Sequence, residues 1–172
     1  MNWDAIGAIG EIIGAFAVVV SIMYLAFQIN SNTRTMRANA GFEATHSWAK
    51  SNEVFSQCSD EQLRIMIRAL STNETWDDFS DIERARISLM FRALFQKLEG
   101  QYYLFKYNTL DEGIWKGRAM FAAGLLQKPF FQSWWIIEKD QRVYSDDFIR
   151  VIESTKQTAV TLDVLGGEMD DG

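Results

Sequence analysis

One acidic side chain, Glu11, is the strongest candidate for chemistry in this sequence. It is the only charged residue in the apolar stretch from Ala5 to Phe27. An ionisable group inside a membrane span is a functional hypothesis by default, because lipid disfavours it. In an oligomer, Glu11 side chains could line or gate a path for ions, with Gln28 on the same face of the helix. The alternative is structural: Glu11 reaches the interface or hydrogen-bonds a neighbouring helix.

Other residue patterns give little support for catalysis. Glu43 and His46 have the spacing of a di-metal helix motif, but such a site needs two motifs and His46 is the only histidine. The single Cys58 excludes an internal disulfide framework. No phosphate-binding loop, dinucleotide fingerprint or nucleophile elbow occurs. We therefore predict no enzyme activity, no catalytic residue, no metal and no cofactor.

The balance of charge argues against one class of partner. The sequence has 172 residues with 17 Lys and Arg against 23 Asp and Glu, a formal net charge of -6. A nucleic-acid-binding protein needs cations to neutralise phosphates. We therefore expect no nucleic-acid partner, and the lipid bilayer is the partner that the apolar stretch indicates.

The stretch from Ala5 to Phe27 is predicted to be a transmembrane helix. At about 1.5 Å per residue it reaches roughly 35 Å, enough to cross a hydrocarbon core of about 30 Å. A cleaved signal peptide is less favoured, because no basic residue precedes the stretch. The predicted interface anchors are Trp3, Tyr24, Arg34 and Arg37. Since the arginines follow the span, the positive-inside rule puts the N-terminus outside and the rest in the cytoplasm.

The predicted span has two unlike faces. One line carries large apolar side chains that suit lipid: Ile9, Ile13, Phe16, Val20, Met23 and Phe27. Another line carries most of the small and polar residues, with Gly10 beside it: Gly7, Glu11, Gly14, Val18, Ser21, Leu25 and Gln28. Small residues let helix backbones approach, and polar ones are tolerated against another helix. We predict helix packing through Gly7, Gly10, Gly14 and Ser21, in a homo-oligomer or with another membrane protein.

The remainder of the chain is predicted to be helical. Hairpin signals are missing, only one proline occurs, and capping-box patterns begin at Ser59, Ser71, Ser80 and Thr109. We predict an all-α fold whose first helix runs from Trp3 to about Phe55 and leads into a cytoplasmic bundle of about five helices. The predicted divisions are a transmembrane helix with interfacial flanks at 1–33, a cytoplasmic domain at 34–158 and a tail at 159–172.

Two features of the predicted bundle concern its interior. The longest helix, from Asp81 to about Tyr107, is expected to turn one apolar face to the core: Ile82, Leu89, Met90, Ala93, Leu94, Leu98, Tyr102 and Phe105. Its Glu99 is expected to be partly buried and paired with Arg92 or Arg118. A later aromatic cluster is interpreted as core, with a segment lying on the membrane surface as the alternative. That cluster is Phe130, Phe131, Trp134 and Trp135.

The first 34 residues resemble an uncharacterised family of short bacterial, often marine, single-span membrane proteins. The resemblance rests on the runs 3–6, 10–15, 18–21, 24–29 and 32–34, and more loosely on the paired Trp134 and Trp135. It implies the architecture, a helical cytoplasmic domain behind one span, and no catalytic residue. Together with the predicted orientation, it implies the inner membrane of a bacterium.

Three functions follow as expectations. The leading one is a non-enzymatic, single-pass protein that self-associates through its span and has a scaffold or accessory role. The first alternative is a homo-oligomeric ion channel with Glu11 in the path. The second is a membrane-tethered ligand-binding domain or enzyme.

Overall fold

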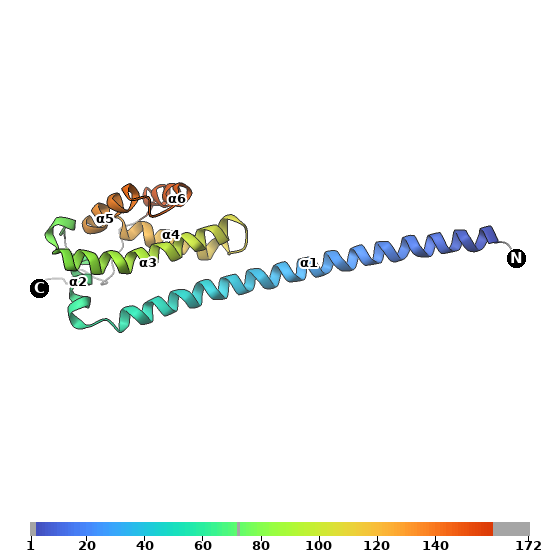
Figure 1. Ribbon diagram of the computed structural model, residues 1–172, viewed down its shortest axis with the longest axis horizontal. Coiled ribbons are helices and arrows are strands. Elements are labelled where there is room, and N and C mark those ends of the chain that lie inside the picture. The colour runs from blue at the N-terminus through green and yellow to red at the C-terminus, as the bar shows by residue number, and fades with distance from the viewer. Residues whose placement is uncertain (1–2, 72, 160–172) are drawn as a thin grey trace, which may run out of the picture. The chain divides into compact units, whose positions relative to one another are not determined.

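Helices account for all the regular structure in the part of the chain that is described. The computed structural model describes residues 3–71 and 73–159, and in this part it contains six α-helices, one short 3₁₀ helix and no strand (Figure 1). The predicted all-α class, with one long apolar N-terminal helix and five further helices, is confirmed. The elements are α1 (Trp3–Ser56), α2 (Asp60–Ser71), η1 (Trp76–Asp78), α3 (Asp81–Lys106), α4 (Glu112–Leu125), α5 (Pro129–Asp140) and α6 (Asp146–Lys156).

The chain divides into two units, Met1–Ala40 and Gly41–Gly172. The first contains the greater part of α1, which no proline interrupts. Every side chain from Ile6 to Asn39 is exposed. Within the described residues, α1 is the one helix long and apolar enough to cross a membrane, and none of its apolar window is buried. Residues 34–40, which we assigned to the domain, fall in this unit.

The second unit is a bundle that includes the last turns of α1. Within it, α4 packs against α3 and α6, α2 packs against α3 and α5, and η1 lies on α5. Residues from Gly41 onward in α1 join the bundle through Ala44, which is buried, and through aromatic contacts. The Trp48 ring lies 5.5 Å from that of Phe121. The Phe55 ring lies 6.2 Å from that of Phe91.

Aromatic side chains form the centre of this bundle. Phe95 of α3 is fully buried, and its ring lies 5.1 Å from that of Trp134 and 5.4 Å from that of Trp135. Phe130 and Phe131 are also fully buried. Pro129 occupies the first turn of α5, where its missing N–H would have no partner in any case. The four aromatics of α5 therefore belong to the core.

Capping residues define most of the helix starts. Ser80 and Glu83 form the predicted capping box of α3, and Ser59 and Gln62 bond reciprocally at the start of α2. The prediction from Ser71 is wrong, since Ser71 ends α2 and the next element is η1. Beyond Thr109, it is Asp111 that accepts hydrogen bonds from the first backbone N–H groups of α4. Thr72 and most of the predicted tail, 160–172, lie outside the described residues.

Two predictions about α3 are confirmed only in part. Leu94 and Leu98 of the predicted face are buried, but Ile82 and Leu89 are 68% and 66% exposed. Ile87, Phe91 and Phe95 are buried in addition. Glu99 is half-buried as predicted, but within the described residues it forms no ion pair with Arg92 or Arg118. Its Oε1 accepts the backbone N–H of Ser145 at 2.7 Å, next to the start of α6.

Candidate functional site

The small and polar line of α1 is exposed along its whole described length. Gly7, Gly10 and Gly14 have no atom within 4 Å of the position that a Cβ would take. Within the unit of residues 1–40, no described contact requires these positions to lack a side chain. Trp3, Tyr24, Arg34 and Arg37, the predicted interface anchors, are exposed as well.

Two of the polar groups in this line are satisfied within α1 itself. Ser21 donates its hydroxyl hydrogen bond to the carbonyl of Ala17 at 2.8 Å. The Gln28 amide donates to the hydroxyl of Tyr24 at 2.8 Å. Glu11 is different, since its exposed carboxyl makes no hydrogen bond or ion pair with any residue that the structure describes. Of the three, only Glu11 has no partner in the described chain.

A second polar group lies deep in the bundle. Glu138 of α5 is only 1% exposed, and its two carboxylate oxygens accept from Arg92 of α3 at 2.6 and 2.9 Å. The hydrogen bond to Glu138 raises the pKa of Arg92. Nearby, Trp134 donates its indole N–H to the hydroxyl of Ser88 at 3.1 Å. These bonds tie α5 to α3, so the pair has a structural role.

Tyr144 borders this cluster. Its hydroxyl is buried and has no hydrogen-bond partner among the described residues. Burial raises the pKa of Tyr144, and the neighbouring charge of Glu138 acts in the same direction. The hydroxyl therefore stays protonated at neutral pH. No group of three or more His, Cys, Asp or Glu side chains suited to a metal occurs in the described part of the chain.

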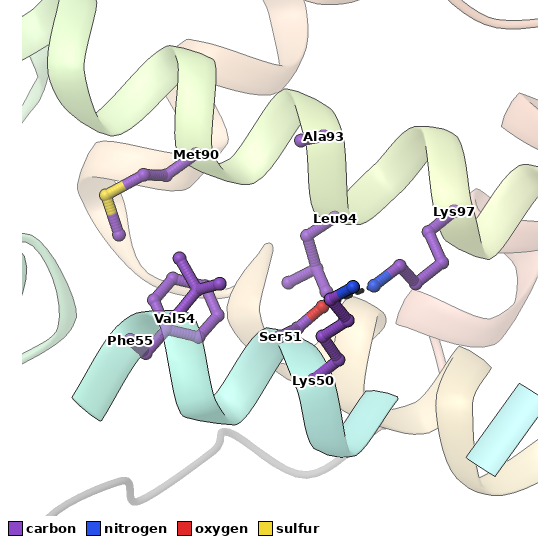
Figure 2. A pocket seen from close by; sticks show the side chains of 8 residues that line it. All are labelled: Lys50, Ser51, Val54, Phe55, Met90, Ala93, Leu94 and Lys97. Atoms are coloured by element: carbon purple, nitrogen blue, oxygen red, sulfur yellow. Dashed lines mark hydrogen bonds between the residues drawn. The ribbon is translucent and has the colours of Figure 1, made fainter. Parts of the chain in front are cut away.

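An open groove of about 320 Å³ lies between the last turns of α1 and the middle of α3 (Figure 2). Val54 and Phe55 of α1 form one apolar wall, and Met90, Ala93 and Leu94 of α3 form the other. The lining residues at one end are polar: Lys50, Ser51 and Lys97. We call this feature the α1–α3 groove.

Lys97 is held in place at the polar end of the α1–α3 groove. Its ammonium donates to the carbonyl of Ser47 at 2.7 Å and also to the hydroxyl of Ser51. Burial lowers the pKa of Lys97, and the charge of Lys50 lowers it further. Within the described residues, neither lysine forms an ion pair with a carboxylate. Two cations thus lie close together beside apolar walls without a counter-charge from the described protein.

This groove is not predicted by the sequence, although the spacing of residues along one of its walls is visible there. Lys97 follows Leu94 by three residues and Met90 by seven, so helical periodicity puts all three on one face. A lysine on an apolar line suggests a half-buried cation. The other wall belongs to a segment far away in the sequence, and no local pattern indicates that pairing.

Fold and sites together define a class: an all-α chain with one helix suited to crossing a membrane, joined to a small helical domain with an aromatic core. The comparisons add no narrower identity. No protein-family model, no curated protein and no solved structure matches this chain.

Proposed function

We propose that this protein is a non-enzymatic, single-pass protein of a bacterial inner membrane, which self-associates through α1 and holds its helical domain in the cytoplasm. The observation that carries the proposal is Glu11, a carboxyl on an exposed apolar helix without a partner in the described chain. A second copy is the simplest source of a partner, because each copy then supplies what the other needs. The role that suits such an assembly is that of a scaffold or accessory protein.

The glycines support the same proposal. An unpaired polar group in lipid favours helix association most when the backbones can approach closely. Gly10 and Gly14 lie on the side of the helix next to Glu11, and nothing in the described chain occupies the space around them. The cytoplasmic location of the domain rests on Arg34 and Arg37, which follow the apolar stretch.

Replacing Gly14 tests self-association. Gly14→Leu has no steric consequence within the described chain but blocks close approach of a second helix, so we expect association to weaken about tenfold. The measurement is mass photometry and crosslinking of the full chain in nanodiscs and in native membranes. Ala8→Leu, about a third of a turn away around the helix, is the matched control and should leave association unchanged. A parent protein that is only monomeric, or a Gly14→Leu variant that associates normally, contradicts the proposal.

An ion path is the second candidate, and the same unpartnered Glu11 favours it. If the helices surround a pore, Glu11 side chains would line it and favour cations. Liposomes that hold the purified protein should then pass cations, and Glu11→Gln should abolish the flux. Absence of flux across the pH range from 5 to 9, with oligomers present, would leave the scaffold role and eliminate the channel.

A further inference from the structure

The α1–α3 groove has the chemical layout of a binding site for an amphiphile. Its walls are apolar over Val54, Phe55, Met90 and Leu94, and its polar end holds Lys50 and Lys97 (Figure 2). Its volume of about 320 Å³ lies at the small end of the range for ligand pockets, which is roughly 300–1,000 Å³. A single hydrocarbon chain suits this size better than the two chains of a phospholipid.

The polar end favours an anion. Lys97 has three N–H donors, of which two go to the carbonyl of Ser47 and the hydroxyl of Ser51. One donor is left for a further acceptor. Lys50 is exposed and close enough to disfavour the charge on Lys97. An anionic group between the two ammonium groups would relieve this repulsion and accept a charge-assisted hydrogen bond.

The surroundings of these two cations combine charge with apolar surface. The domain pairs some of its basic side chains with carboxylates, as in Arg92 with Glu138, Lys139 with Glu153 and Lys116 with Glu112, and leaves others without such a pair. Lys50 and Lys97 form no such pair among the described residues. Their position beside exposed apolar wall residues such as Val54, which is 59% exposed, joins charge and apolar surface in one place.

We propose that the α1–α3 groove binds the anion of a single-chain fatty acid, with the carboxylate between Lys50 and Lys97 and the hydrocarbon chain along Val54, Phe55, Met90 and Leu94. This binding function goes beyond self-association in the membrane and does not depend on it. Each methylene that leaves water contributes to affinity, while the carboxylate selects fatty acids over neutral alcohols of the same length.

The test is calorimetric titration of the full chain in phosphatidylcholine nanodiscs with laurate, with protein-free nanodiscs as the blank. Dodecanol is the matched neutral probe. We expect saturable binding of laurate, about tenfold weaker binding of dodecanol, and about tenfold weaker binding of laurate to Lys97→Met. Ala93→Trp, which fills the groove from α3, should remove laurate binding. Lys116→Met, an exposed lysine of α4, is the control and should bind laurate like the parent.

Three outcomes overturn the proposal: no binding of laurate, equal affinity for laurate and dodecanol, and laurate binding that neither lysine affects. Because Lys97→Met also removes hydrogen bonds to α1, the exposed Lys50→Met decides the matter if thermal melting shows that the first variant is destabilised. If laurate does not bind, and the lysine variants alter only association with phosphatidylglycerol vesicles, the groove receives a lipid headgroup and the proposal is wrong. Gly14→Leu separates the two proposals, since it should weaken association and leave laurate binding unchanged.

Discussion

The buried carboxylate of Glu138 shows how a single residue can depend on one partner. Its side chain is only 1% exposed, and Arg92 supplies both of its short charge-assisted hydrogen bonds. Removing one member of a buried ion pair destabilises the fold by more than the intact pair stabilises it. The reason is that the remaining charge stays in a poorly polarisable environment. Here the destabilisation depends on which partner is removed. Arg92 is 32% exposed and can turn toward water when Glu138 is lost, whereas Glu138 stays buried when Arg92 is lost.

Removal of the arginine should therefore destabilise the domain strongly. We expect Arg92→Met to lower the free energy of unfolding by about 3 kcal/mol, because it leaves the Glu138 charge buried without its main partner. Glu138→Gln should cost about 1 kcal/mol, since it removes the charge and keeps a polar side chain of similar shape. Urea unfolding followed by circular dichroism measures both. Arg86→Met, which breaks the exposed pair with Glu61, is the control and should change stability by less than about 0.5 kcal/mol. Equal effects of Arg92→Met and Arg86→Met would show that the buried pair is not structural.

At the scale of elements, α3 explains where sequence patterns fail. Its start follows from the Ser80 and Glu83 capping box, and its length follows from the absence of proline and the run of helix formers. The face that it buries follows only in part, because α3 packs against α2 and α4 and also contacts the end of α1 and α5. A helix with several neighbours has no single apolar stripe. Ile82 and Leu89 fit the periodicity as well as the residues that are actually buried.

The same reasoning applies to the candidate sites. The Glu11 and glycine line lies in one helix, so its spacing can be read from local sequence. The α1–α3 groove and the Arg92–Glu138 pair each join segments more than 40 residues apart, as the hydrogen bonds between Lys97 and Ser51 and between Arg92 and Glu138 show. Only the tertiary fold brings such residues together.

Two substitutions in α3 test the assignment of its buried face. Phe95→Ala should lower stability by roughly 3–5 kcal/mol, because it empties the space between Trp134 and Trp135. Leu89→Ala should change stability by less than about 0.5 kcal/mol, since Leu89 is exposed in the described structure. Thermal and urea unfolding compare the two variants directly. A large loss from Leu89→Ala would mean that this face of α3 is covered in the functional protein, for instance by a second copy.

At the scale of the whole molecule, the boundary of the domain lies inside a helix and not in a linker. The chain divides between Ala40 and Gly41, although α1 continues without interruption to Ser56. After the boundary, Ala44 becomes buried and Trp48 and Phe55 contact rings of the bundle. Hydrogen bonds reinforce these contacts, since Gln101 donates to the carbonyl of Ala44 at 3.3 Å and Lys97 to that of Ser47. The last turns of α1 are therefore part of the domain core.

Truncations on either side of this segment test that conclusion. A chain that begins at Gly41 keeps Ala44, Trp48 and Phe55, so we expect it to be helical, water-soluble and cooperative in urea unfolding. A chain that begins at Asp60 lacks these residues and uncovers Phe91 and Phe121, so it should lose about 3 kcal/mol or more of stability and bind hydrophobic dyes. Circular dichroism and dye fluorescence distinguish the two outcomes. Equal unfolding midpoints would mean that the domain begins only at α2, and that residues 41–56 are an extension of the apolar first part of α1. If the Gly41 chain is also monomeric where the full chain associates, self-association belongs to the first 40 residues, because the two proteins differ in nothing else.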